Sequence, residues 1–364
     1  MKVNLVRLFV FLSLFPLSGC SLFIRGVIVN NKDDAAINQL PRIDPNDPNN
    51  HISLTVVDKQ GERKTKVHIL ENGFSIDTGE NPCRVKFKKD RKFIVSGVKL
   101  EAEFIGCSQT YPVIIDTGLA KPILVNDIHI LENKLSILAN PGGEDGICKL
   151  PDLSIGELTF RNLIANCNFH HAEVHLLGFP VDKDNNIYLG LDLLRKFKYV
   201  GFDYVNEDVE FSSTKSFSTL TGNSWSNYPF VIKEGRKGNT RLVVRIPMNG
   251  LNMNLVFDTG NPIVMLTTEK AWKQMSKEVL EYKKSHKKTF MPFAGGRIAA
   301  RTVVVKELKV GQNIVTNASV AILPDNNPLF ASEKNENGLL GVQCFADSSI
   351  VLDFEHNLMW VNDK

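Results

Sequence analysis

The sequence lacks a strong excess of either charge. Its 364 residues include 43 Lys and Arg against 40 Asp and Glu, which gives a formal net charge of +3. Nucleic-acid-binding proteins concentrate basic residues, so this balance argues against nucleic acid as the main partner. Beyond its first residues the chain also lacks apolar runs long enough for a transmembrane helix. With 43% hydrophobic and 23% charged residues, the composition is that of a globular protein and excludes a disordered chain.

The one long apolar stretch lies at the N-terminus. A basic start precedes an apolar run over residues 8–15, which is typical of a secretory signal peptide. The residues at 17–20 are Leu-Ser-Gly-Cys, and small residues directly before a cysteine resemble the lipobox of bacterial lipoproteins. The resemblance implies removal of residues 1–19 as a signal peptide and lipid, such as palmitate, on Cys20. The alternative is a signal peptide that contains a cysteine by coincidence.

Lipidation of Cys20 implies a membrane-anchored protein of the bacterial cell envelope. Acyl chains contribute ~0.8 kcal/mol per buried methylene, so a multiply acylated cysteine is a stable anchor. Ser21 follows the cysteine, and in lipoproteins this residue favours the outer membrane, with the protein facing the periplasm. Residues 20–50 are rich in Pro, Asn and Asp, which predicts a flexible tether. Alternating apolar residues then predict an N-terminal β extension over residues 51–94.

Five cysteines remain when Cys20 is set aside, so at least one has no partner within the chain. The cell envelope permits disulfides. Cys148 and Cys167 are the first pair to consider, and two buried free thiols are an equal alternative.

An internal repeat organises the rest of the chain. Residues 99–118 (KLEAEFIGCSQTYPVIIDTG) align without a gap with residues 241–260 (RLVVRIPMNGLNMNLVFDTG). Each copy predicts a strand, a turn and an apolar strand that ends in Asp-Thr-Gly. Further shared motifs follow in the same order: the Gly-Gly pairs Gly142-Gly143 and Gly295-Gly296, and the apolar-apolar-Gly steps Tyr188-Leu189-Gly190 and Leu339-Leu340-Gly341.

The repeat predicts two copies of one fold, which agrees with about two domains for a chain of this length. The predicted boundaries are a first lobe over 95–215, a polar linker over 216–239 and a second lobe over 240–364. Strand-like segments dominate both copies. The clearest helical segment is 268–284, behind a threonine cap and with a Lys-rich end.

This order of motifs resembles the lobes of aspartic proteases, over about residues 95–364. The lobes are similar in size to retropepsins, and their duplication in one chain is similar to pepsin. The resemblance implies an all-β fold of two tandem retropepsin-like barrels, related by a pseudo-twofold axis, with a cleft between the lobes. It also implies an aspartic-type endopeptidase that acts as a monomer on peptide or protein substrates, without metal or other cofactor.

The chemistry explains why two aspartates are needed. Two carboxylates held close together cannot both ionise easily, so one keeps its proton. The ionised one can act as general base on a water, while the protonated one polarises the peptide carbonyl. The resemblance assigns these roles to Asp116 and Asp258. The supporting and flap candidates are Thr117, Gly118, Thr259, Gly260, Gly142, Gly143, Gly295 and Gly296.

Two departures from the family pattern favour a second hypothesis. The family usually follows Asp-Thr-Gly with Ser, Thr or Ala, whereas this chain has Leu119 and Asn261. The Leu119 side chain cannot donate a hydrogen bond to the outer carboxylate oxygen. The alternative is therefore a catalytically inactive lipoprotein that binds a peptide or protein partner. No tyrosine lies near either Gly-Gly pair, which leaves Phe290 and Phe293 as candidates to cover a substrate.

Two further motifs need an interpretation. A third Asp-Thr-Gly begins at Asp77 but lacks the preceding repeat, so it predicts a turn in the N-terminal extension, and the alternative makes it the catalytic aspartate of the first lobe. In a strand, His171, Glu173 and His175 would share one face. Three such side chains can hold zinc, but a pH-sensitive surface patch is favoured and no metal site is assigned.

Overall fold

A computed structural model describes the following residues: 8–12, 24–31, 33–44, 47, 52–59, 62–69, 75–77, 80–88, 98–139, 145–176, 179–219, 224–234, 240–261, 263–276, 282–293, 296–327 and 336–363. Cys20, Thr78, Gly79, Gly142, Gly143 and Gly295 lie outside them. Within this part of the chain, no helix is long and apolar enough to cross a membrane.

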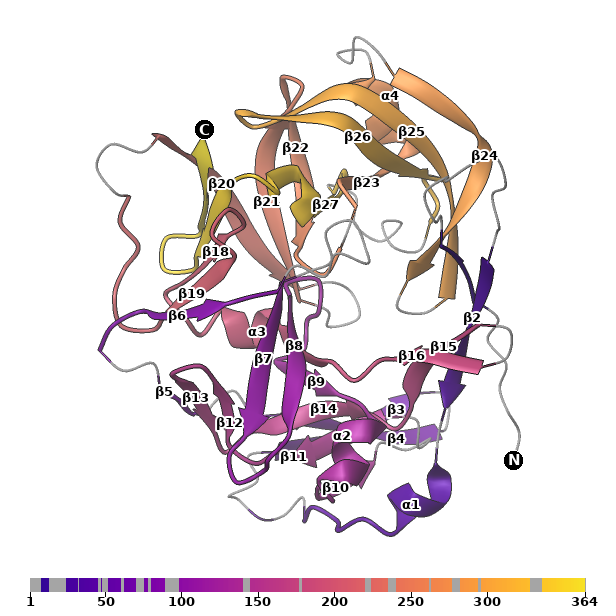
Figure 1. Cartoon of the computed structure of the whole chain (residues 1–364), viewed down its shortest axis with the longest axis vertical. Helices are drawn as coiled ribbons and strands as arrows, with labels where there is room; N and C mark the ends of the chain where they lie inside the picture. Colours follow the sequence, from indigo (N-terminus) through magenta and orange to yellow (C-terminus); the bar gives the residue numbers. More distant parts are fainter. Residues whose placement is uncertain are drawn as a thin grey trace.

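The described chain is nearly all β-structure, which confirms the predicted fold class. The first lobe is built on a ten-stranded sheet, in the lower half of Figure 1. Across this sheet the strands are β10 (Ile137–Ala139), β11 (Asp145–Lys149), β14 (Ile164–Asn168), β9 (Ile123–Val125), β17 (Ile187–Gly190), β8 (Thr110–Asp116), β7 (Lys99–Phe104), β12 (Leu153–Ile155), β13 (Leu158–Arg161) and β5 (Ser75–Asp77).

The second lobe and the strands between the lobes form one thirteen-stranded sheet. Its lobe strands are, in order, β24 (Tyr282–Phe293), β25 (Gly296–Val310), β26 (Asn313–Leu323), β23 (Met265–Thr268), β27 (Gly338–Gly341), β22 (Leu251–Asp258), β21 (Thr240–Met248) and β20 (Ser224–Glu234). It continues through β29 (Leu358–Asp363), β28 (Ser349–Asp353), β18 (Tyr199–Asp203), β19 (Asp208–Ser212) and β6 (Cys83–Lys86).

The remaining elements are short or peripheral. A four-stranded sheet contains β1 (Leu8–Leu12), β2 (Ile24–Asn31), β15 (His171–Leu176) and β16 (Phe179–Lys183), and a separate hairpin contains β3 (Ile52–Lys59) and β4 (Glu62–Ile69). The helical segments are α1 (Asp34–Asn38), α2 (Asp127–Glu132), α3 (Leu191–Leu194), α4 (Glu269–Met275) and the 3-10 turn η2 (Val342–Phe345). The predicted tether over residues 20–50 therefore contains the regular elements β2 and α1.

The two lobes share one strand order. The order β14-β9-β17-β8-β7 in the first lobe matches β26-β23-β27-β22-β21 in the second. Each Asp-Thr-Gly strand, β8 or β22, has a parallel neighbour that carries the apolar-apolar-Gly step, β17 or β27. The short helical turns α3 and η2 follow these steps at equivalent places. The sequence repeat is thus a repeat of structure.

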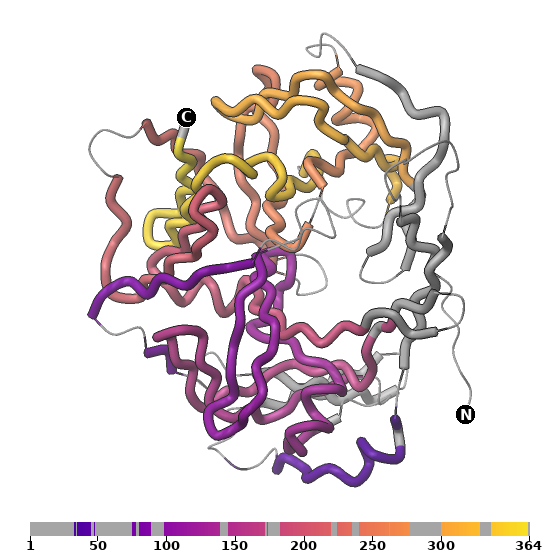
Figure 2. Tube along the Cα trace, in the orientation of Figure 1, coloured from indigo at the N-terminus to yellow at the C-terminus, as the bar shows by residue number. Residues whose placement is uncertain are grey.

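The lobes join through the antiparallel pair β18–β28. Gly201 lies directly opposite Val351 in this pair, and these two residues occupy equivalent positions in the closing strands of the two lobes. The pseudo-twofold axis therefore passes between them. Figure 2 shows the same arrangement along the Cα trace, where β6 from the N-terminal region lies beside the closing strands of the first lobe.

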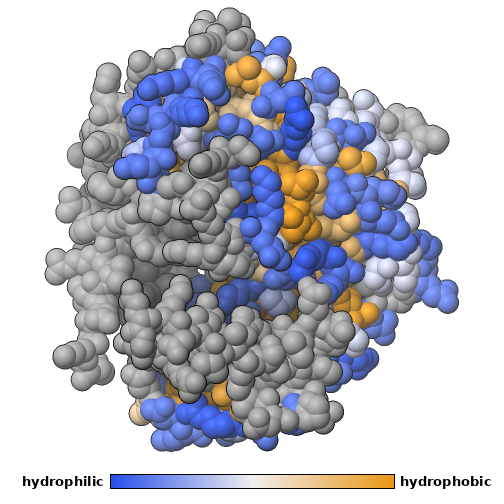
Figure 3. Space-filling model, turned by 180° about the vertical axis from the view of Figure 1, so that it is seen from behind, coloured by the Kyte–Doolittle hydropathy of each residue, from blue (hydrophilic) through white to orange (hydrophobic). Residues whose placement is uncertain are grey.

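The core is continuous across both lobes. One cluster of buried hydrophobic side chains includes residues of both Asp-Thr-Gly strands, both lobe sheets and the interlobe strands. Its largest fully buried members include Tyr111, Phe104, Phe160, Phe169, Phe202, Phe211, Phe257 and Phe345. Seen from behind in Figure 3, hydrophilic side chains dominate the coloured surface, and a band of hydrophobic residues lies near its middle.

One local prediction was wrong, and one segment has more regular structure than its polar composition suggests. The predicted helix over 268–284 contains only α4, which begins after the cap Thr268 as expected, whereas the Lys-rich end belongs to strand β24. The predicted linker over 216–239 contains strand β20, which pairs with β21 and β29. Tyr228 and Phe230 of β20 are buried at alternate positions, so pairing and burial override the polar composition of that segment.

Candidate active site

Asp116 and Asp258 are the last residues of β8 and β22, and the two strands meet near the centre of the molecule (Figure 1). In β8 the side chains of Tyr111, Val113 and Ile115 are buried in the lobe core. Because side chains alternate along a strand, Asp116 belongs to the opposite face. Strand geometry thus directs the carboxylate away from the core of its own lobe.

The apolar-apolar-Gly steps lie beside the two aspartates. Gly190 of β17 is opposite Asp116, and Gly341 of β27 is opposite Asp258. A Cβ atom on Gly190 would lie 1.9 Å from the carbonyl oxygen of Lys121, and one on Gly341 would lie 1.9 Å from that of Ile263. Only glycine therefore lets the backbone after each aspartate fold back against the neighbouring strand.

The two carboxylates face each other and share a hydrogen bond. A Cβ atom on Gly118 would lie 2.5 Å from Cγ of Asp258, and a Cβ atom on Gly260 would lie 2.7 Å from Cγ of Asp116. The glycine of each Asp-Thr-Gly loop therefore makes room for the aspartate of the other lobe. Each carboxylate also accepts the backbone N–H of the glycine two residues later, at 2.8 Å in the first lobe and 2.9 Å in the second.

Thr117 and Thr259 lock the two loops together across the lobe interface. The Thr117 N–H donates to Oγ1 of Thr259 at 2.9 Å, and the Thr259 N–H donates to Oγ1 of Thr117 at 3.0 Å. Each hydroxyl then donates to the carbonyl of the residue before the other aspartate, Phe257 at 2.8 Å and Ile115 at 2.7 Å. Both threonines are fully buried. Hydrogen bonds therefore cross the lobe interface in both directions.

The environment of the carboxylates favours retention of a proton. Burial raises the pKa of Asp116, although hydrogen bonds from Asp258 and from backbone N–H groups oppose this shift. Burial raises the pKa of Asp258 well above its usual value, and the charge of Asp116 and the hydrogen bond between the carboxyl groups act in the same direction. The two groups titrate as a pair. We therefore expect the pair to keep one proton at pH values at which an isolated aspartate would have lost it.

The residues after the two motifs act differently from the family pattern. Leu119 contributes only its backbone N–H, which lies 3.2 Å from Oδ1 of Asp116. The Asn261 carboxamide oxygen accepts the N–H of Ile263 at 3.3 Å, and its buried nitrogen has no hydrogen-bond partner among the described residues. Neither side chain therefore donates a described hydrogen bond to Asp116 or Asp258.

We expect Leu119→Thr to move the acidic limb of the pH–rate profile to lower pH. A threonine hydroxyl beside Asp116 would stabilise the ionised carboxylate and oppose the rise in pKa caused by burial. The measurement is kcat/KM against pH, with Leu119→Met as the control that changes shape without adding a donor. An unchanged profile in the threonine variant would contradict this account of Leu119.

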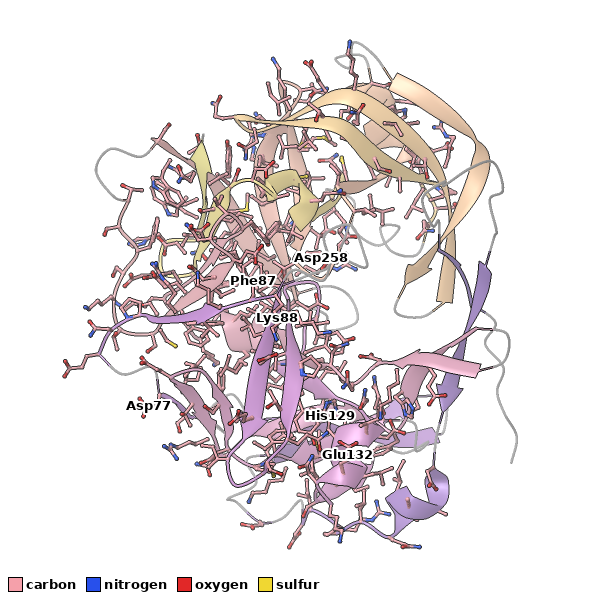
Figure 4. All side chains as sticks on the ribbon, viewed as in Figure 1. Asp77, Phe87, Lys88, His129, Glu132 and Asp258 are labelled. Atoms are coloured by element: carbon pink, nitrogen blue, oxygen red, sulfur yellow. The ribbon has the colours of Figure 1, made fainter. Side chains whose placement is uncertain are left out.

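The third Asp-Thr-Gly motif is separate from this site. Asp77 ends β5, where it lies opposite Thr159 of β13. Figure 4 shows Asp77 at the outer side of the first lobe, away from Asp258. The carboxylate that contacts Asp258 belongs to Asp116. The structure thus brings together the two repeat-derived aspartates, and Asp77 does not join them.

The histidine cluster is an ion-pair network. His171 Nδ1 lies 2.9 Å from Oδ1 of Asp127, and Nε2 lies 3.2 Å from Oε1 of Glu173. The hydrogen bond to Asp127 raises the pKa of His171 against the opposing effect of burial. Among the described residues, no group of three or more His, Cys, Asp or Glu is arranged to hold a metal ion. The side chain of His175 lies outside the described part.

The remaining candidates are a pair of cysteines, the Gly-Gly pairs and two phenylalanines. Cys148 and Cys167 are buried free thiols that interact across the neighbouring strands β11 and β14, so the alternative without a disulfide describes them. Gly296 begins β25, where it lies opposite Phe293 of β24, and Gly295 lies outside the described residues. Gly142 and Gly143 lie outside the described residues. The side chains of Phe290 and Phe293 are not described.

Comparison with known proteins gives one family match. Residues 243–344 match a family model described as aspartyl protease. This segment contains Asp258, Thr259, Gly260 and the step that ends at Gly341. It covers most of the second lobe, so the family resemblance of the first lobe rests on the shared strand order and the repeat.

Two solved structures are similar to the chain. The first is described as the crystal structure of edgp and has 9% identity and a TM-score of 0.44. The match covers 77% of this chain and 94% of the edgp chain. The second is described as the crystal structure of Basic 7S globulin from soybean and has 10% identity and a TM-score of 0.43. The match covers 78% of this chain and 97% of the globulin chain. No curated protein matches the sequence.

Proposed function

We propose that this protein is an aspartic endopeptidase that hydrolyses extended peptide segments of proteins. The observation that supports this proposal is the hydrogen-bonded pair of half-buried carboxyl groups, one from each lobe, with raised pKa values. A pair of this kind offers a base and an acid at the same place. Structural aspartates at strand ends would not require glycines that accommodate the carboxylate of the opposite lobe.

The reaction follows from the single proton that the pair holds. The ionised carboxylate takes a proton from a water molecule, which attacks the peptide carbonyl carbon. The protonated carboxyl group donates a hydrogen bond to the carbonyl oxygen as negative charge develops there. Breakdown of the tetrahedral intermediate then breaks the C–N bond, and the amine leaves with a proton from the pair. The cross-lobe hydrogen bonds of Thr117 and Thr259 fix the distance between the carboxyl groups.

The proposal includes a place of action. The Leu-Ser-Gly-Cys sequence at 17–20 and the following Ser21 support a lipid anchor on Cys20 in the outer membrane of a bacterial envelope. The protein would then meet peptide or protein substrates in the periplasm. Metabolic labelling with a clickable fatty acid tests the anchor, because Cys20→Ser should lose the label.

The proposed activity can be tested with the full chain in detergent. We expect it to cleave members of a diverse peptide pool between acid and neutral pH, as detected by mass spectrometry. Peptides that bind without being cleaved at any pH would instead support the alternative, a non-catalytic lipoprotein that holds a peptide or protein partner. That alternative is supported by the departures from the family pattern at Leu119 and Asn261.

A further inference from the structure

The two lobes present different chemistry on the sheet faces that carry the aspartates. In the first lobe, Tyr188 of β17 lies opposite Ile114 of β8 and Leu124 of β9. Ile187 and Leu189, on either side of Tyr188, are fully buried in the core. Tyr188 is half-buried and therefore belongs to the opposite face, which it shares with Ile114 and, one pleat further along β8, with Asp116.

The matched position in the second lobe is apolar. Leu339 lies opposite Val256 of β22 and Leu266 of β23, at the register that Tyr188 has in the first lobe. Leu339 packs with Ile263 against a separate small cluster that contains Leu266, Ala300, Ala321 and Leu323. Where the first lobe has a phenol, the second therefore has an aliphatic surface.

Tyr188 is the end of a polar row. Asp184 and Asn186 precede it at alternate positions, so all three share one side of an extended segment. The Tyr188 hydroxyl donates to Oδ2 of Asp184 at 3.0 Å, and the Asn186 side-chain amide donates to Oδ1 at 2.7 Å. The charges of Asp184 and of Asp116 both raise the pKa of Tyr188, after the larger effect of burial. The polar row is therefore electrostatically close to the catalytic pair.

Two features of this row point to a ligand. Asp184 forms no ion pair with a Lys or Arg among the described residues, so its negative charge is not neutralised there. The carboxamide oxygen of Asn186 is buried and has no hydrogen-bond partner in the same part of the chain. A buried acceptor without a partner is unfavourable, and a charged donor would satisfy both groups.

The segment is also held in place. His129 of α2 is fully buried, and its Nε2 lies 3.0 Å from the carbonyl oxygen of Asn185. The side-chain amide of Asn126 donates to the carbonyl oxygen of Asp184. These contacts fix the backbone between the polar side chains, so the acceptors are positioned before a ligand arrives.

We propose that Asp184, Asn186 and Tyr188 form a subsite for a basic side chain, and that Leu339 and its neighbours form an apolar subsite at the matched place in the second lobe. This inference rests on the proposed peptide hydrolysis and names its substrate class. The substrate is a peptide with Lys or Arg on one side of the cleaved bond and an aliphatic residue on the other.

A peptide library randomised on both sides of a central bond tests the inference in two ways. The full chain is assayed for cleavage, and the Asp116→Asn variant, which should bind without cleaving, is assayed for enrichment of bound peptides. We expect Lys or Arg to be selected on one side and Leu, Ile or Val on the other. In Asp184→Asn, the preference for Lys and Arg over Leu should fall about ten- to hundred-fold, because a charge-assisted hydrogen bond is lost.

Two more variants complete the test. Tyr188→Phe removes only the hydroxyl and should weaken the same preference by a smaller factor, which covers the case that Asp184→Asn fails to fold. Leu339→Ile is the matched control in the second lobe and should leave the basic preference intact. Apolar selection on both sides, or a basic preference unchanged in both first-lobe variants, would overturn the subsite. Enrichment of basic peptides without any cleavage would retain the subsite and refute the proposed function.

Discussion

Replacing either Asp116 or Asp258 by Asn is expected to lower kcat for peptide hydrolysis by about a thousandfold or more. In the proposed reaction each aspartate supplies a different part of the chemistry, so neither can act for both. The hydrogen bond between the two carboxyl groups means that loss of either one also changes the protonation of the other. The measurement is kcat on a peptide that the parent cleaves, with binding of the same peptide measured in parallel.

A stability measurement separates this loss from unfolding. An aspartate in the unfolded chain has a pKa of about 4, and the folded pKa of Asp258 is raised. The protonated Asp258 carboxyl therefore stabilises the folded state fully at pH values below the unfolded pKa of about 4. This contribution is lost as pH rises through the folded pKa. Because Asn does not ionise, Asp258→Asn should match or exceed the parent in Tm at neutral pH. The difference should shrink as the pH is lowered.

Asp77→Asn is the matched control for both experiments. It alters the same three-residue motif, but Asp77 lies at the end of β5 on the outer side of the first lobe (Figure 4). The variant should keep the activity of the parent. Loss of activity in Asp77→Asn, or its survival in Asp116→Asn, would contradict the assignment of the pair.

The meeting of Asp116 and Asp258 could be predicted from sequence because the repeat contains the Asp-Thr-Gly strand twice. Two 20-residue copies with the same strand, turn and Asp-Thr-Gly order must fold alike, and the later Gly190 and Gly341 identify the neighbouring strand in each copy. Glycine was informative here because the backbone approach in each lobe leaves no room for a Cβ atom. Local sequence and long-range packing thus gave the same answer.

Prediction failed where local sequence and tertiary pairing disagree. The segment 216–239 is polar, yet β20 becomes a strand because β21 and β29 supply hydrogen bonds on both sides. The Lys-rich residues after α4 have good helix propensity, but β24 pairs with β25 instead. The polar row from Asp184 to Tyr188 shows a two-residue alternation. Nothing in the sequence alone indicates that this face also carries Asp116.

Thr117→Val is expected to lower the free energy of unfolding by about 2–5 kcal/mol, since it leaves two buried groups without partners. These groups are the N–H of Thr259 and the carbonyl of Phe257, both hydrogen-bonded to the Thr117 hydroxyl. The loss is a large fraction of the roughly 5–15 kcal/mol that stabilises a typical domain. Chemical denaturation at fixed pH measures it. Thr117→Ser keeps the hydroxyl and should recover most of the loss.

A double-mutant cycle shows whether the two threonines act as one lock. If removing either hydroxyl already loosens the contact between the loops, Thr117→Val and Thr259→Val together should cost less than the sum of the single variants, by about 0.5–3 kcal/mol. Thr267→Val is the control, because its buried hydroxyl donates to the carbonyl of Asn337 within one lobe, at 2.7 Å. Its effect should add to that of Thr117→Val. Additive losses in the Thr117–Thr259 pair would mean that the two threonines stabilise the protein independently. The alignment of the two carboxyl groups would then not depend on a contact that both threonines share.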